Sequence, residues 1–201
     1  MMTLRPLLLA ATAFHLIIAS PLTQGADGPV APAAAASTPS PEAVLQKGFT
    51  SLMAFLQQNR PTSELGIFLE QEIAPHFDFD YMAQTVAGPY WRQMNGEQQK
   101  LFTAKFRQTF FEALTQRMGN LGRPQVQFYP PRPSARANEV VVSARVAQPQ
   151  GVDALIDFRF YRGKEGWKVF DVMANGSSAL LFYRSQLAEQ VQRRGLAGLM
   201  Q

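Results

Sequence analysis

The sequence predicts an α+β domain in which helices pack on an antiparallel four-stranded sheet. Apolar residues recur with helical spacing up to residue 118, alternate with a period of two over residues 126–174, and return to helical spacing after residue 178. With 46% hydrophobic and 17% charged residues in a chain of 201, the composition is that of one ordinary domain. Helices, then strands, then a helix indicate helices that cover one face of a sheet.

The first 40 residues are expected to precede the folded domain. Residues 1–25 have the pattern of a secretory signal, in which Arg5 lies before a mainly apolar run and small residues follow. The run over residues 7–19 is shorter than the roughly 20 residues of a membrane-spanning helix, so an uncleaved anchor is the minor alternative. Residues 26–40 are rich in Ala and Pro, which is typical of a linker. The folded domain is therefore expected over residues 41–201.

Capping residues and helix breakers delimit the first three helices. Ser40 is the expected N-cap of a first helix that ends before Pro61. Ser63 is the expected N-cap of a second helix. A short third helix is expected to begin with Asp80 as its cap and to end at Gly88.

The fourth helix has the strongest signal of the chain. Asn95 and Gln98 have the spacing of a capping box, with Asn in place of the usual Ser or Thr. An apolar stripe with a spacing of four residues follows: Phe102, Phe106, Phe110, Leu114 and Met118. On sequence alone, this stripe is either part of the core or one wall of a ligand pocket.

Four strands and a last helix complete the pattern. The strands are expected over residues 126–128, 140–146, 156–161 and 167–174. A four-residue hairpin loop over residues 163–166 gives a register with these pairs: Arg162 with Trp167, Phe160 with Val169, Phe158 with Asp171, and Ile156 with Met173. This register predicts an apolar face that contains Asp171. Ser177 or Ser178 is expected to cap the last helix, which Gly195 ends.

Several classes of chemistry are excluded by composition. The sequence has no Cys, and its two His are His15, inside the expected signal, and His76. Cysteine nucleophiles, thiolate metal sites and disulfides are therefore absent, and one remaining His argues against His-dependent hydrolysis and zinc sites. The formal charge of +4 is below that of a dedicated nucleic-acid surface. We expect no cofactor, no metal, no nucleic-acid partner and no enzymatic activity.

Three polar groups each have two interpretations. The acidic residues around His76 form either a metal or acid/base site or a solvated helix end with Asp80 as a cap: Glu70, Glu72, Asp78 and Asp80. Asp171 is either an acid/base group in a cavity or a carboxylate hydrogen bonded to backbone or Ser groups. The turn over residues 175–178 is either an anion site or a simple capping turn.

The chain resembles the periplasmic MlaC family, the toluene-tolerance auxiliary proteins of ABC transport systems, from about Pro41 to Leu199. The resemblance rests on the order and spacing of three groups of residues: Pro75, Phe77, Asp78, Phe79, Met82, Ala83, Gly88 and Trp91; Phe102 and Phe106; and Trp167, Val169, Phe170, Asp171, Val172, Tyr183, Arg184 and Gly195. The chain departs from the family in two places. Phe170 stands where Tyr is common, and residues 175–178 replace a Glu-Gly-Val-Ser turn, which removes a carboxylate.

The resemblance implies a lipid carrier. Members hold the acyl chains of a phospholipid in an apolar cavity between helices and a cone-like, NTF2-like twisted sheet, and shuttle it between an outer-membrane lipoprotein complex and an inner-membrane MCE-domain ABC transporter. This implies a periplasmic, monomeric protein concerned with lipid transport and outer-membrane lipid asymmetry. The alternatives are a hopanoid or other polycyclic ligand, a structural adaptor, and a small cavity enzyme that uses Asp171 as acid/base.

Face alternation selects the residues expected to contact the lipid, with Leu181 near the mouth of the cavity. These residues are Phe106, Phe110, Val142, Phe158, Phe160, Val169, Asp171 and Leu181. Replacing Phe158 by Asp is expected to abolish lipid copurification and to leave the domain folded.

Overall fold

The helical half of the fold begins where the sequence predicted it. In the computed structural model, residues 38–58, 60–118, 124–147 and 152–196 are described, so the predicted signal and the linker up to residue 37 lie outside them. All described residues belong to one unit, Thr38–Gln201. Helix α1 (Pro41–Leu56) has Ser40 as its N-cap, and the Ser40 hydroxyl accepts a hydrogen bond of 3.1 Å from the Ala43 amide.

The next two helices form, but their caps differ from the prediction. Helix α2 (Thr62–Phe68) has Pro61 at its N-cap position and no capping side chain, so Ser63 lies inside the helix. The chain then continues through a π-helical turn, η1 (Leu69–Ile73), and a 3₁₀ turn, η2 (Ala74–His76). Asp78, not Asp80, caps α3 (Phe79–Ala87), because the Asp78 carboxylate accepts a hydrogen bond of 2.9 Å from the Tyr81 amide.

The capping box of the long helix is confirmed. A 3₁₀ turn, η3 (Gly88–Gln93), leads into α4 (Gly96–Met118). The Asn95 side chain accepts a hydrogen bond of 2.9 Å from the Gln98 amide, and the Gln98 side chain accepts one of the same length from the Asn95 amide. Two amides that have no partner inside the helix are thus satisfied reciprocally.

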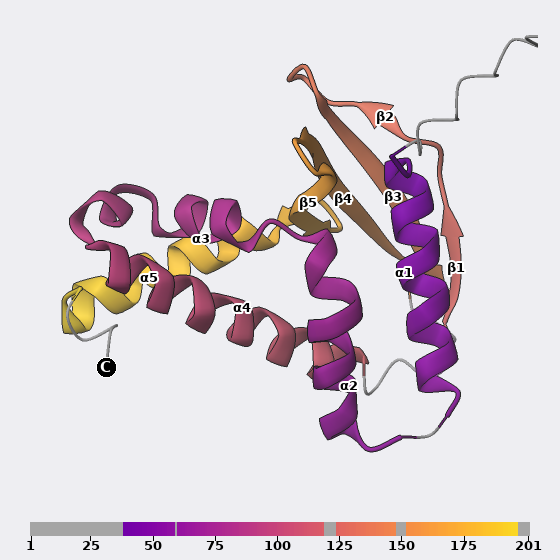
Figure 1. The fold of residues 1–201 in the computed structure, drawn as a ribbon, viewed down its shortest axis with the longest axis horizontal. Helices are drawn as coiled ribbons and strands as arrows, with labels where there is room; N and C mark the ends of the chain where they lie inside the picture. The colour runs from indigo at the N-terminus through magenta and orange to yellow at the C-terminus, as the bar shows by residue number, and fades with distance from the viewer. Residues whose placement is uncertain (1–37, 59, 119–123, 148–151, 197–201) are drawn as a thin grey trace, which may run out of the picture. The chain divides into compact units, whose positions relative to one another are not determined.

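The described strands form one antiparallel sheet in the order β1-β3-β4-β5-β6, with β2 paired to β3. Figure 1 labels β1 to β5. The four predicted strands are β1 (Gln125–Phe128), β3 (Glu139–Ala147), β4 (Ala154–Gly163) and β5 (Gly166–Ala174). Two strands of two residues each were not predicted: β2 (Arg132–Pro133) and β6 (Ser177–Ser178).

The hairpin between β4 and β5 is shorter than predicted. Gly163 pairs with Gly166, so the loop has two residues, and the predicted pair of Arg162 with Trp167 is present. The pair of Phe160 with Val169 is present as well. A β-bulge then leaves Phe170 without a partner on β4, and the predicted register is wrong beyond it.

A second tight turn leads into the last helix. Asn175 and Gly176 have φ values of 49° and 81°, and they connect β5 to β6 in the conformation that two-residue hairpins favour. Ser178 then caps α5 (Ala179–Arg194), with its hydroxyl accepting a hydrogen bond of 3.2 Å from the Leu181 amide. The helix ends at Gly195, at a φ of 69°, as predicted.

The helices pack in two places around the sheet. Helix α1 lies along β3, whereas α3 packs against α4 and α5, and α5 also contacts β5 (Figure 1). The α+β class and the antiparallel sheet are therefore confirmed. Among the described residues, no helix combines the length and hydropathy that crossing a bilayer requires.

Candidate functional site

Four of the predicted lipid contacts lie together on one face of the sheet. Val142, Phe160 and Val169 are at most 1% exposed, and the partly buried Phe158 packs against them. Their alternation along β3 and β4 places them on the same side, where Val142 pairs with Phe158 and Phe160 with Val169. Val44 and Leu45 of α1 and Phe77 pack on this group, which we call the sheet cluster.

Phe106 and Phe110 lie in a different group, among the helices. Both are buried on α4, and their rings pack edge to face against Phe79 of α3, with centroids 6.2 and 5.7 Å away. Tyr183 of α5 lies 5.4 Å from the Phe106 ring. Burial raises the pKa of the Tyr183 hydroxyl above its ordinary value. We call this group and the buried residues around it the helix cluster.

Phe77 and Val172 connect the two clusters, because each packs against both. Phe77 follows η2, forms an isolated bridge with Val169, and has its ring 5.6 Å from Phe79. The predicted apolar contacts therefore form two packed groups that meet at one junction. An enclosed apolar cavity between the sheet and the helices stays a prediction.

Asp171 does not lie on the apolar face of the sheet. The bulge at Phe170 shifts the register, so that Asp171 pairs with Arg159 and Phe158 pairs with Val172. Likewise, Ile156 pairs with Ala174 and not with Met173. The predicted position of Asp171 beside Phe158 is therefore wrong, and the carboxylate lies on the opposite face.

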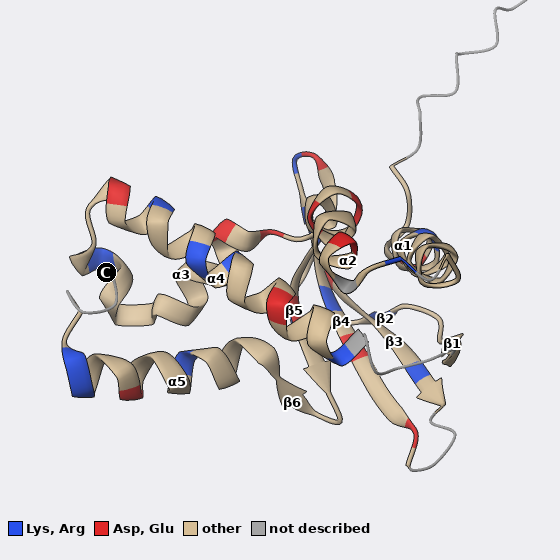
Figure 2. Cartoon of the chain, turned by 90° about the horizontal axis from the view of Figure 1, so that it is seen from below, with Lys and Arg blue, Asp and Glu red and all other residues tan. Residues whose placement is uncertain are grey.

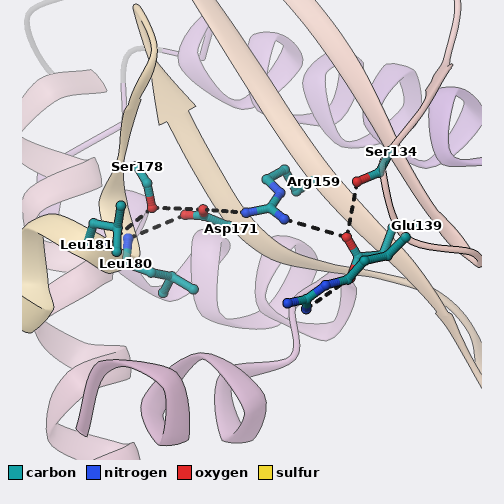
Figure 3. Close-up of polar contacts among 8 residues, drawn as sticks. Ser134, Glu139, Arg159, Asp171, Ser178, Leu180 and Leu181 are labelled. Carbon is teal, nitrogen blue, oxygen red and sulfur yellow. Dashed lines mark hydrogen bonds and ion pairs between the residues drawn. The ribbon is translucent and has the colours of Figure 1, made fainter. Parts of the chain in front are cut away.

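On that face, Asp171 is only 1% exposed and is fully hydrogen bonded (Figure 3). One carboxylate oxygen accepts a hydrogen bond of 2.8 Å from the Ser178 hydroxyl and lies 3.4 Å from the Arg159 guanidinium. The other oxygen accepts a hydrogen bond of 3.3 Å from the Leu180 amide at the start of α5. Asp171 thus joins the first turn of α5 to the sheet, which agrees with the hydrogen-bonded interpretation of this residue.

The polar network continues across the sheet from Arg159 to β3. The guanidinium lies 3.5 Å from the Glu139 carboxylate, which also accepts a hydrogen bond of 3.2 Å from Ser134 (Figure 3). Further along the same face, the Asp157 carboxylate accepts hydrogen bonds from Ser143 and Arg132. One face of the sheet is therefore apolar and the other holds paired charges.

Leu181 is 65% exposed on the first turn of α5, where Phe182 is 57% exposed. Its amide is bound by the Ser178 cap, and its side chain belongs to neither cluster. The predicted place of Leu181 at a mouth stays a prediction.

A groove of about 840 Å³ opens between α4, the η1 and η2 turns, the start of α3 and the β4–β5 hairpin. Phe77 and Phe79 line it together with charged side chains of both signs. The Lys168 ammonium donates a hydrogen bond of 2.8 Å to the Pro75 carbonyl, and Arg107 forms an ion pair with Glu70. None of the eight predicted lipid contacts is among the residues that line this groove.

The pKa values of two side chains near the groove are shifted. Burial, followed by the nearby Lys168 and Lys47, lowers the pKa of His76 below its ordinary value. Burial, followed by the hydrogen bond from its hydroxyl to Asp78, raises the pKa of Tyr161 to about 12. Asp78 thus connects α3, which it caps, to β4.

The other polar candidates have structural partners. Across the described residues, no three His, Asp or Glu side chains are placed to hold a metal ion, so the acidic residues around His76 give no metal cluster there. In the turn over residues 175–178, the Asn175 side chain accepts a hydrogen bond of 2.9 Å from the Leu155 amide and Ser178 caps α5. These contacts are those of a capping turn.

Sequence reasoning from face alternation missed the residues at the junction. Phe77 was not predicted as a lipid contact, although the aromatic spacing of Phe77 and Phe79 was visible in the sequence. Val44 and Leu45 of α1 were also missed as neighbours of the sheet cluster.

Figure 2 shows that Lys and Arg are interspersed with Asp and Glu along α5 and along the helices opposite it. This distribution agrees with the modest net charge of the sequence.

Two comparisons with known proteins bear on the family and the fold of this chain. A family model described as MlaC protein matches residues 46–201. A solved structure of a phospholipid-binding protein from Ralstonia solanacearum, in complex with a phospholipid, is similar in fold with a TM-score of 0.70 and 24% sequence identity. The match covers 79% of this chain and 91% of the other.

Proposed function

The chain belongs to the MlaC family, and from this membership we propose that it is a periplasmic carrier that holds the acyl chains of a phospholipid and shuttles the lipid between membrane complexes. The observation that carries the proposal is the family match over residues 46–201. The phospholipid in the similar structure from Ralstonia solanacearum supports this choice of ligand.

The two apolar clusters supply a physical basis for binding. Each methylene moved from water into apolar surroundings contributes about 0.8 kcal/mol, so acyl chains bind without catalytic groups or a metal. In this proposal the chains lie against Phe158 and Phe160 of the sheet cluster and against Phe106 and Phe110 of the helix cluster. The junction at Phe77 and Val172 then parts to admit them, because a close-packed interior has no room for a chain otherwise.

The proposed setting follows from the family. Export through the predicted signal at residues 1–25 places the carrier in the periplasm. Its partners are an outer-membrane lipoprotein complex, which supplies or receives lipid, and an inner-membrane MCE-domain ABC transporter. Docking on either partner loosens the helices over the lipid and thereby lowers its affinity.

Lipid content of the purified protein tests the proposal. The measurement is native mass spectrometry, followed by analysis of an organic extract. Phe158→Asp is the informative variant, because Phe158 is only partly buried and lies on the apolar face. Leu155→Asp is the matched control, since Leu155 lies on the same strand but on the opposite face and is 42% exposed.

We expect bound diacyl lipid in the wild type and in Leu155→Asp, and its loss in a folded Phe158→Asp. Equal lipid content in the two variants would remove Phe158 from the binding site. A wild type without lipid would favour a structural adaptor, a bound polycyclic lipid would change the ligand class, and turnover that Asp171→Asn abolishes would favour an enzyme.

A further inference from the structure

We propose that the groove beside Phe77 is the headgroup site of the carrier and that it selects zwitterionic over anionic phospholipids. This inference rests on the proposed function, because it assumes that acyl chains enter between the two clusters. To the proposed function it adds the place where acyl chains enter the protein and the charge of the headgroup that the protein prefers.

The groove reaches the junction of the two clusters. Phe77 lines the groove and packs against both the sheet cluster and the helix cluster. Its neighbour Phe79 also lines the groove and belongs to the helix cluster. A chain that enters past Phe77 therefore passes directly from the groove to the junction, and its headgroup stays in the groove.

The size of the groove suits a ligand group. Its volume of about 840 Å³ lies within the range of roughly 300–1,000 Å³ that small-molecule sites occupy. Phe77 and Phe79 supply aromatic surface, and the Arg107 guanidinium lies 5.5 Å from the centroid of the Phe79 ring. A lining of aromatic and charged side chains suits the boundary between acyl chains and a polar headgroup.

Both signs of charge line the groove. The cations are Lys100, Arg107 and Lys168, and the carboxylates are Glu70, Asp78, Asp80 and Glu165. Three positive and four negative side chains leave a formal charge of −1. A zwitterionic headgroup places its phosphate near cations and its ammonium near carboxylates, whereas an anionic headgroup has the same phosphate but no ammonium to pair with the carboxylates.

Some of these charges are available to a ligand. Lys100 is 78% exposed, and its ion pair with Glu97, 3.0 Å long, lies on the surface of the same helix, where such pairs contribute little. Asp80 is exposed, and no side chain among the described residues pairs with it. Asp78, in contrast, is engaged by the Tyr81 amide and the Tyr161 hydroxyl. Lys100 is therefore assigned to the phosphate, and Asp80 to the ammonium.

Competition between two lipids tests the site. The full-length protein is delipidated and incubated with vesicles that contain equimolar phosphatidylethanolamine and phosphatidylglycerol with identical acyl chains. Bound lipid is then quantified by native mass spectrometry for the wild type and for Asp80→Lys, Lys100→Glu and Lys105→Glu. Lys105→Glu is the matched control, since Lys105 lies on α4 with Lys100 but does not line the groove.

We expect the wild type to take up phosphatidylethanolamine with a preference of about threefold to tenfold, the range that one or two exposed charge contacts support. Asp80→Lys is expected to reverse or abolish the preference, and Lys100→Glu to lower total uptake several-fold, whereas Lys105→Glu leaves both unchanged. Circular dichroism verifies that each variant is folded.

Failure of the headgroup site is distinguishable from failure of the carrier. A wild type that takes up both lipids equally, or an Asp80→Lys variant with the wild-type ratio, would overturn the headgroup site and leave the carrier intact. A wild type that takes up neither lipid would overturn the proposed carrier and, with it, this inference.

Discussion

Asp171 is held by three groups at once, and its replacement tests whether that role is structural. Asp171→Ala leaves the Ser178 hydroxyl, the Leu180 amide and Arg159 without their shared acceptor. Hydrogen bonds to a buried charge contribute about 1.5–3 kcal/mol, and Arg159 is partly exposed, so we expect the free energy of unfolding to fall by about 2–3 kcal/mol in urea denaturation.

Two further variants make this prediction specific. Asp171→Asn keeps one acceptor oxygen and is expected to cost less than Asp171→Ala. Asp153→Asn removes a carboxylate from another ion pair of the sheet, in which Arg145 is 54% exposed, and is expected to cost less than about 1 kcal/mol. Equal losses for Asp171→Ala and Asp153→Asn would contradict a structural role for the Asp171 network.

Tyr161 should make stability depend on pH in the alkaline range. Its pKa is raised from 10.0 to about 12 in the folded protein, so the fold favours the neutral phenol. The stabilisation is complete below pH 10 and is lost as pH rises towards 12, because the unfolded chain then releases a proton that the folded chain retains.

The comparison with Tyr161→Phe isolates this effect from the other tyrosines. The variant also lacks the hydrogen bond to Asp78, and we expect it to be less stable by about 1 kcal/mol at pH 8. The difference between wild type and variant, measured by chemical denaturation, should narrow from pH 10 to pH 12. A difference that stays constant over this range would show that the pKa of Tyr161 is not raised.

Alternation along the strands placed three residues on the correct face of the sheet and misplaced Asp171, because only Asp171 lies beyond a shift in strand register. The pairing of β3 with β4, which positions Val142 and Phe160, has no bulge, and Val169 precedes the bulge on β5. A period of two was therefore enough to place these three residues on one face. Asp171 lies after the bulge at Phe170. No glycine or other local signal marks that position, and the contacts of Phe170 with Tyr81 and Tyr161 come from distant segments.

At the scale of elements, two glycines offer a matched pair of substitutions. Gly176 lies at a φ of 81° in the turn between β5 and β6, whereas Gly66 lies inside α2, and a Cβ at either position would meet no atom within 4 Å. Gly176→Ala should therefore lower the free energy of unfolding by about 1 kcal/mol through backbone strain alone. Gly66→Ala should raise it by about 0.5–1 kcal/mol, because Ala favours the helix.

Thermal and chemical denaturation of the two variants check the opposite signs. If Gly176→Ala and Gly66→Ala both destabilised the protein, the space around each Cβ, and not the backbone conformation, would limit these positions.

The caps show which element boundaries a sequence can predict. The capping box of Asn95 and Gln98 is local and was predicted, and the cap at Ser178 is one of the two that the sequence allowed. Asp78 and Asp80 are both plausible caps, and the choice of Asp78 depends on its amide, which donates a hydrogen bond of 2.9 Å to the carbonyl of Val169 on β5. Strand β6 was missed although Asn175 and Gly176 form the dipeptide most typical of a tight hairpin.

At the scale of the whole domain, the sequence predicted the class of fold and the apolar faces but not their separation into two clusters. Helical and strand periodicity predict which side of each element is buried. Which buried sides meet depends on the path of the chain between elements. Helix α1 contributes Val44 and Leu45 to the sheet cluster but Leu52 and Phe55 to the helix cluster, most of whose other members lie on the later helices. Phe77 belongs to both because the segment after η2 runs beside β5.

The separation of the core into two clusters that meet at Phe77 and Val172 predicts which segments change their dynamics when lipid binds. A ligand that binds only the folded state slows the local opening of the segments that it contacts. If acyl chains lie at the junction, hydrogen exchange should slow on lipid loading in the segments that carry Phe77 and Val172, namely residues 74–87 and β5. Strand β1 forms the far edge of the sheet from β5, and its exchange should not change. Hydrogen exchange with mass spectrometry on delipidated and loaded protein measures both. Slowing confined to α1 and β1 would instead place the lipid on the outer part of the sheet, away from the junction.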